Sequence, residues 1–195
     1  MAAVAGSGTD IDHPNDHLVE DFLACDIPEI LRGELVDGEI LITPFGGGIR
    51  TIARLVSQII RGSAAEWDFL GRAGLIAPSA PGRPRNHVIP DGVFVRCDAD
   101  LPDGENPWNP IEDVAATMLV EFTRARPEQA REAKRYSYAR AAVPFYLLVD
   151  QHRRKTILFS GPRGGDYRRA DWAPFGKPLP LPEPFGIDLD TSDFA

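Results

Sequence analysis

Two carboxylates stand in or beside strand-like stretches, where an ionised group needs a cation or hydrogen-bond donors to balance its charge. Glu121 lies within the apolar run 118–123, and Asp91 follows Pro90 inside a second β-prone run, 87–95. If two neighbouring strand ends meet, these carboxylates converge, and hard oxygen ligands of this kind suit Mg²⁺ or Mn²⁺. Each also has a plainer interpretation, Asp91 as a turn residue in Pro-Asp-Gly and Glu121 as the partner of a nearby arginine.

Lysine is scarce in this chain, with three lysines against 18 arginines, and Lys134 lies close in sequence to Glu121. The pattern predicts a helix over about 127–142, with Tyr138 one turn after Lys134 on the same face. A helix packed across the sheet would direct the Lys134 ammonium towards the two carboxylates. The alternative is an exposed helix lysine that has no part in a site.

A strand–helix–strand unit would hold these side chains in place. The runs 118–123 and 144–150 are almost continuously apolar, which is typical of strands buried on both faces. A right-handed crossover through the helix 127–142 makes the two strands parallel. We therefore expect both strands at the centre of a sheet, with the basic helix covering one face.

The rest of the chain reads as one mixed α/β domain, residues 18–195, after a flexible leader, residues 1–17. The strongest local signal is Asp37-Gly38 between two β-prone runs, which predicts a hairpin over 33–42. Further predicted elements are a helix 49–62, a short strand 74–77, a loop 98–113 ending in a helical turn, a hairpin of 155–160 with 167–169, and an extended proline-rich strap 174–184.

Composition and charge exclude several classes of protein. The chain has 195 residues, 43% hydrophobic and 26% charged, with a net charge of −8, so it is not a wholly basic nucleic-acid-binding domain. Residues 122–155 nevertheless hold nine basic and three acidic residues, which indicates either an anion-binding face or a solvated helix flank. Two cysteines are too few for a disulfide framework, and no apolar run reaches membrane-spanning length. We expect a cytoplasmic protein without a membrane partner.

Several segments, taken in their order, also form a familiar pattern. They are Glu34-Leu35-Val36-Asp37-Gly38-Glu39, Pro90-Asp91, Leu119-Val120-Glu121-Phe122-Thr123, Glu132-Ala133-Lys134, the stretch Tyr138–Asp150 and the ending Pro182–Phe194. Together they resemble the putative restriction endonuclease family of the PD-(D/E)XK nuclease superfamily, over about residues 27–194.

This resemblance implies a restriction-endonuclease-like core, a mixed central sheet flanked by helices with N-terminal and C-terminal hairpins. It also implies an endonuclease acting on DNA, in which Asp91 and Glu121 hold Mg²⁺ or Mn²⁺ and Lys134 assists the attacking water. Glu34 would be a further acidic residue of the catalytic site. The wider superfamily carries its lysine two residues after the glutamate, where this chain has Thr123, so Lys134 would be its substitute.

Two departures from the family pattern keep a second function open. An acidic residue usually precedes the helix lysine by four positions, where this chain has Ala130, although Glu128 or Glu132 could compensate. The first helix commonly starts with a histidine, where this chain reads Gly48-Ile49-Arg50. The alternative is a catalytically weakened nuclease-fold module that acts in binding or in homodimer assembly.

Overall fold

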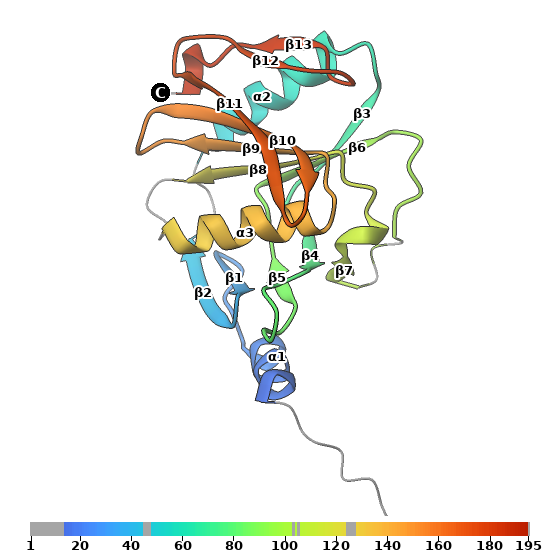
Figure 1. Cartoon of the computed structure of the whole chain (residues 1–195), viewed down its shortest axis with the longest axis vertical. Coiled ribbons are helices and arrows are strands. Elements are labelled where there is room, and N and C mark those ends of the chain that lie inside the picture. The colour runs from blue at the N-terminus through green and yellow to red at the C-terminus, as the bar shows by residue number, and fades with distance from the viewer. Residues whose placement is uncertain (1–13, 45–47, 103, 105, 124–127, 195) are drawn as a thin grey trace, which may run out of the picture.

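A six-stranded mixed sheet runs through the centre of the computed structural model, which describes residues 14–44, 48–102, 104, 106–123 and 128–194 (Figure 1). Its strand order is β11-β10-β9-β8-β6-β3. In chain order the strands are β3 (Trp67–Leu70), β6 (Gly92–Arg96), β8 (Met118–Thr123), β9 (Phe145–Asp150), β10 (Lys155–Arg163) and β11 (Asp166–Pro174). The predicted hairpin after 155 is therefore confirmed, with longer strands than expected.

The predicted strand–helix–strand unit is confirmed at the middle of this sheet. Strands β8 and β9 are parallel, with Glu121 opposite Leu148, and every residue of both strands is buried. Helix α3 (Glu128–Arg140) connects them and covers one sheet face (Figure 1). Continuous apolar runs are typical of such strands because both of their faces meet packed layers.

A second, five-stranded sheet has the order β2-β1-β5-β4-β7. Its strands are β1 (Leu31–Val36), β2 (Glu39–Pro44), β4 (Gly74–Ala77), β5 (Asn86–Val88) and β7 (Trp108–Pro110). The predicted hairpin is β1–β2, and Asp37 and Gly38 both take positive φ values, 47° and 83°. Two consecutive residues in this region form the turn whose twist matches antiparallel strands, which explains the Asp-Gly pair.

The predicted single strand over 87–95 is wrong, because the run divides into β5 and β6 in different sheets. The break falls at Ile89-Pro90-Asp91. Pro90 has no amide hydrogen for a ladder, so pairing stops there and the chain crosses from one sheet to the other. Asp91 is thereby carried to the junction of the two sheets.

Several elements were not predicted, among them one helix and two short strands. Helix α1 (Pro14–Ala24) begins inside the expected leader, and residues 1–13 lie outside the described residues. Its buried Phe22 packs against the rings of His87 and Trp108, with centroids 5.6 and 5.7 Å away. Strands β3 and β7 are short, and β7 falls in the segment 98–113 that we expected to be a loop, while the helical turn at its end, η1 (Ile111–Asp113), is confirmed.

The central sheet separates two hydrophobic cores. Met118, Val120 and Phe122 face the core under the predicted helix α2 (Ile49–Gly62), while Leu119 joins the core under α3. The proline-rich strap 174–184 contains β12 (Leu179–Leu181), which pairs with β13 (Ile187–Leu189). Together with the turn η2 (Ser192–Phe194), these strands close the α2 side (Figure 1). None of the described helices is both long and apolar enough to span a membrane.

Candidate active site

Lys134 lies at the centre of a buried charged cluster. Its ammonium donates hydrogen bonds to Glu34 Oε1 at 2.6 Å and to Glu121 Oε1 at 2.7 Å. Because α3 lies across the sheet, the side chain points inward and only 2% of the residue is exposed. The interpretation of Lys134 as an exposed helix lysine is therefore wrong.

Asp91 joins this cluster from the link between the two sheets. Its Oδ2 accepts the backbone N–H of Phe122 at 2.7 Å, which sets the carboxylate beside β8 next to Glu121. Its Oδ1 accepts a hydrogen bond from the Arg32 guanidinium at 2.9 Å. Asp91 is therefore more than a turn residue, because its side chain is hydrogen-bonded to the neighbouring strand β8.

Glu34, on β1, hydrogen-bonds to the segment that links β5 to β6 and carries Asp91. Its Oε1 accepts the backbone N–H of Ile89 at 2.7 Å in addition to the Lys134 ammonium. Arg32, two residues earlier on the same strand face, donates to the carbonyl oxygen of Ile89 at 2.8 Å. The two strand residues thus hold the segment that carries Asp91.

Arg32 is a site residue that the sequence analysis missed. It is buried, and its Nε lies 3.8 Å from Glu34 Oε2. The sequence did contain a signal, because Arg32 and Glu34 are two residues apart and so lie on the same face of a short strand that is otherwise apolar. Two opposite charges at that spacing indicate a buried ionic contact rather than a solvated face.

Tyr138 lies one turn after Lys134 on the inward face of α3, as expected. Its hydroxyl donates to Glu121 Oε1 at 3.0 Å. Burial, and then the charge of Glu121, raise the pKa of Tyr138 well above its ordinary value. The phenol therefore stays protonated and acts as a hydrogen-bond donor to the carboxylate.

Burial and neighbouring charges act on the pKa values of Asp91 and Lys134. Burial and then the nearby charge of Glu121 raise the pKa of Asp91 to about 6, against the opposing effect of Arg32, the Phe122 amide and Lys134. Burial lowers the pKa of Lys134, but Glu121 and Glu34 outweigh it, so the net pKa lies above the ordinary value and the ammonium stays charged. Asp91 and Glu121 are therefore close enough for their negative charges to interact.

The donor set fits a divalent cation. Three carboxylates (Glu34, Asp91 and Glu121) meet two protein cations (Arg32 and Lys134), which leaves one negative charge in surplus when all are ionised. Asp91 is the most accessible acid, with 16% of its side chain exposed against 1% for the two glutamates. In the described part of the chain no three His, Cys, Asp or Glu side chains form a ready-made metal cage, and Arg32 and Lys134 now contact the carboxylates that would bind the ion.

The residues at the departures from the family pattern do not enter the cluster. Ala130 is buried on α3, Glu132 is exposed, and the side chain of Glu128 lies outside the described residues. Gly48 lies on the opposite sheet face, where an added Cβ would sit 3.4 Å from Phe122 Cδ1. Thr123 is buried and its hydroxyl accepts a hydrogen bond from Arg131 at 3.4 Å, so it contributes no cation.

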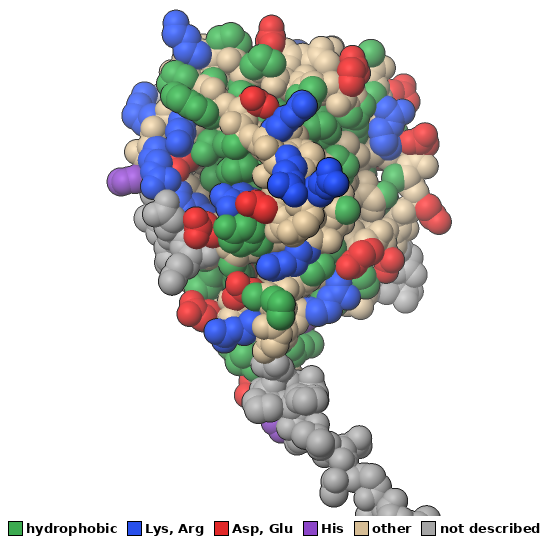
Figure 2. Space-filling model, viewed as in Figure 1, with side chains coloured by type: hydrophobic (Ala, Val, Ile, Leu, Met, Phe, Trp, Pro, Cys, Tyr) green, Lys and Arg blue, Asp and Glu red, His purple; other side chains and the backbone are tan. Residues whose placement is uncertain are grey.

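The basic stretch 122–155 is partly neutralised within the fold. Arg131 pairs with Asp150 at 3.0 Å and Arg135 with Asp166 at 3.0 Å, while Lys134 is enclosed in the site. Arg124 and Arg126 lie outside the described residues. Figure 2 shows acidic and basic side chains interspersed over the face that carries α3. This stretch therefore does not form a uniformly basic surface on that face.

Comparisons with known proteins agree with this fold. A family model described as putative restriction endonuclease (Uma2) matches residues 19–192. The crystal structure of a putative nuclease of the DUF820 family from Anabaena variabilis superimposes with a TM-score of 0.64 at 14% sequence identity, covering 90% of this chain and 96% of that chain. That structural similarity establishes a shared fold. No curated protein matches the chain.

Proposed function

The chain belongs to the putative restriction endonuclease family, and we propose on that premise that it is a metal-dependent endonuclease that hydrolyses phosphodiester bonds of DNA. The observation that carries the proposal is the contact of one buried ammonium, Lys134, with Glu34 and Glu121 beside Asp91. Residues far apart in the chain converge there at the junction of two sheets. A purely structural core would be expected to use apolar side chains at such a position.

Asp91 and Glu121 would hold Mg²⁺ or Mn²⁺ in this function. The chemistry supplied by such an ion when bound is neutralisation of charge on the phosphate and a lower pKa of the attacking water. Lys134 has three N–H donors, of which Glu34 and Glu121 accept two, so the third is available to orient a water molecule or a phosphate oxygen. Glu34 and Tyr138 would keep Lys134 and Glu121 in position.

The test is cleavage of supercoiled plasmid DNA with Mg²⁺ or Mn²⁺, with EDTA as the control. We expect metal-dependent nicking by the native protein and a loss of about 100-fold or more in Asp91→Asn and Glu121→Gln. Asp171→Asn is the matched control, because it neutralises an exposed carboxylate on β11. Nicking that persists in EDTA, or equal rates in Asp91→Asn and Asp171→Asn, would refute the proposal.

A second candidate is a catalytically weakened module that keeps the nuclease fold for binding or homodimer assembly. The observation that favours it is that Arg32 and Lys134 already contact the carboxylates, together with Ala130 at the usual acidic position. Calorimetric titration with Mn²⁺ separates the two candidates. Saturable binding by native protein that Asp91→Ala removes supports the enzyme, whereas equally negligible heats from both proteins support the module.

A further inference from the structure

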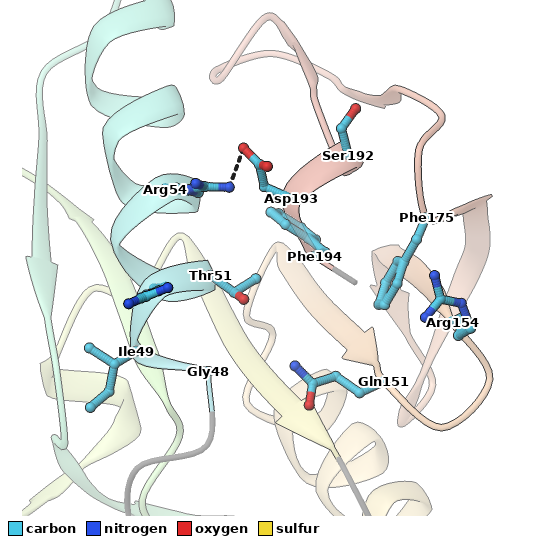
Figure 3. A pocket seen from close by; sticks show the side chains of 11 residues that line it. Gly48, Ile49, Thr51, Arg54, Gln151, Arg154, Phe175, Ser192, Asp193 and Phe194 are labelled. Atoms are coloured by element: carbon cyan, nitrogen blue, oxygen red, sulfur yellow. Dashed lines mark ion pairs between the residues drawn. The ribbon is translucent and has the colours of Figure 1, made fainter.

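A cleft of about 670 Å³ lies on the α2 side of the central sheet (Figure 3). Its walls come from the first turn of α2, the β9–β10 turn, the residue after β11 and the C-terminal turn η2. None of the four predicted site residues lines it. The function proposed above therefore leaves this cleft without a role.

The cleft is basic although the protein as a whole is acidic. Three guanidinium groups line it, those of Arg50, Arg54 and Arg154, against the single carboxylate of Asp193. Asp193 pairs with Arg54 (Figure 3), so among the described residues that line the cleft the charges of Arg50 and Arg154 are in surplus. On a chain with a net charge of −8, an excess of two positive charges among the described residues of one cleft indicates an anionic ligand.

A buried polar side chain also points into the cleft. Thr51 is only 7% exposed, and its side chain projects from α2 into the hollow (Figure 3). No other described residue hydrogen-bonds to its hydroxyl, so this group can serve a ligand in the cleft. Gly48, which starts the helix with φ 87°, provides no side-chain cap for the N–H groups of this turn. Hydroxyl and amide donors together are the groups that bind phosphate at a helix start.

The cleft also adjoins the candidate active site through β8. Gly48 lies against Phe122, where an added Cβ would be 3.4 Å from the ring, and the Phe122 amide donates to Asp91 Oδ2 at 2.7 Å. One residue of β8 thus contacts the cleft wall with its side chain and the catalytic carboxylate with its backbone. A strand of nucleic acid that passes the site at Asp91 would bring a neighbouring phosphate towards this cleft.

We propose that the cleft binds a phosphodiester group of a nucleic acid strand, through Arg50, Arg154 and the Thr51 hydroxyl. This inference rests on the proposed nuclease function, because it assigns a second contact to the same substrate. Arg54 forms an ion pair with Asp193, which offsets the negative charge of that carboxylate in the cleft. The Phe175 ring, with the Arg154 guanidinium 5.8 Å from its centroid, limits where that guanidinium can lie.

Binding is measured by fluorescence anisotropy of a labelled DNA duplex in EDTA, so that no cleavage occurs. We expect Arg50→Gln/Arg154→Gln to lose at least tenfold in affinity and to lower the salt-dependence slope by about two, one for each lost phosphate contact. Thr51→Val should lose about fivefold with an unchanged slope, since it removes a hydroxyl and no charge. The matched control, Arg168→Gln/Arg169→Gln, removes the same charge from exposed positions near the other end of the β10–β11 hairpin.

Equal losses in the two double variants would overturn the inference, because they would reflect overall charge alone. Inorganic phosphate provides a second probe. If native protein binds free phosphate in the cleft but Arg50→Gln/Arg154→Gln retains native DNA affinity, the ligand is a free phosphate and the inference fails.

Plasmid cleavage distinguishes failure of this inference from failure of the proposed function. If Arg50→Gln/Arg154→Gln loses DNA affinity but the native protein does not cleave plasmid, only the proposed nuclease function is refuted. If the native protein cleaves plasmid but Arg50→Gln/Arg154→Gln binds DNA as tightly as the native protein, only the inference about the cleft is refuted.

Discussion

The Lys134 ammonium is buried and hydrogen-bonded to the carboxylates of Glu34 and Glu121, so its removal leaves two acids without that cation. In Lys134→Ala, Glu34 and Glu121 remain buried without that cation, next to a new cavity. We expect the free energy of unfolding to fall by about 3–5 kcal/mol, the range found when one partner of a buried ion pair is deleted. Urea denaturation measures this, with the exposed Lys177→Ala as the control. A loss no larger than that of Lys177→Ala would contradict the buried pairing.

Asp91 predicts a definite dependence of stability on pH. Its pKa in the folded protein is about 6, above the ordinary value of 3.8, so the folded state keeps the proton over a range in which the unfolded chain releases it. The stabilising contribution of Asp91 is therefore complete below about pH 4 and is lost as the pH rises through 6. Unfolding free energies from pH 4 to 7 should show this decline in native protein relative to Asp91→Asn. A constant difference between the two proteins would show that the pKa is not raised.

At this scale the sequence predicted which residues meet, and it missed one partner. Glu121 and Lys134 stood out because a carboxylate in a buried strand and a rare lysine on the next helix both need an explanation. Arg32 did not, because an arginine near the start of a strand is usually solvated. In the cluster, Arg32 contacts Asp91, and Lys134 contacts Glu34 and Glu121, so both cations offset the charge of the buried acids. The chemical roles of these residues remain predictions.

At the scale of elements, the break between β5 and β6 determines where Asp91 lies. Gly92 follows directly, and a Cβ added there would be 2.2 Å from the Phe69 ring on β3. We expect Gly92→Ala to destabilise the protein by about 1–3 kcal/mol, because the ring or the strand must shift. Phe69→Leu should recover part of that loss in a double-mutant cycle of thermal unfolding. Additive effects of the two substitutions would show that the contact is not the cause.

Several elements could be predicted from short-range sequence patterns. The β1–β2 turn, α2 and the β8–α3–β9 unit follow from turn residues and hydrophobic periodicity. The division of 87–95 was missed because both halves are β-prone and the change of sheet is decided by tertiary pairing. Strand β7 has three residues and exists because it pairs with β4, which no local signal reveals.

For the whole molecule, the two protein cations in the cluster predict that folding does not require metal. The protein should unfold cooperatively in EDTA, since Arg32 and Lys134 already contact the buried acids. At a Mn²⁺ concentration about 100 times the dissociation constant, the stabilisation is about 2.7 kcal/mol, or roughly 5–10 °C in melting temperature. Calorimetric melting with and without Mn²⁺ checks this, and Asp91→Asn should lose the increase. A native protein that is unfolded in EDTA would contradict the expectation that Arg32 and Lys134 suffice to stabilise the buried acids.

The assembly of the site from both sheets is the part that sequence reasoning could not derive. Glu34 comes from the five-stranded sheet, Glu121 from the six-stranded sheet, and Asp91 from the link between them. Their approach depends on how the sheets pack, and the family resemblance supplied Glu34 where residue patterns alone did not.

The proposed function requires a divalent-metal site formed by Asp91 and Glu121 next to Lys134. The most direct measurement is an anomalous-difference map from crystals of the native protein grown with Mn²⁺. We expect one strong peak within coordination distance of carboxylate oxygens of both Asp91 and Glu121, and no such peak in crystals of Asp91→Asn. A map in which Arg32 and Lys134 keep their contacts and Mn²⁺ is absent from the cluster, or binds only elsewhere, would contradict the claim.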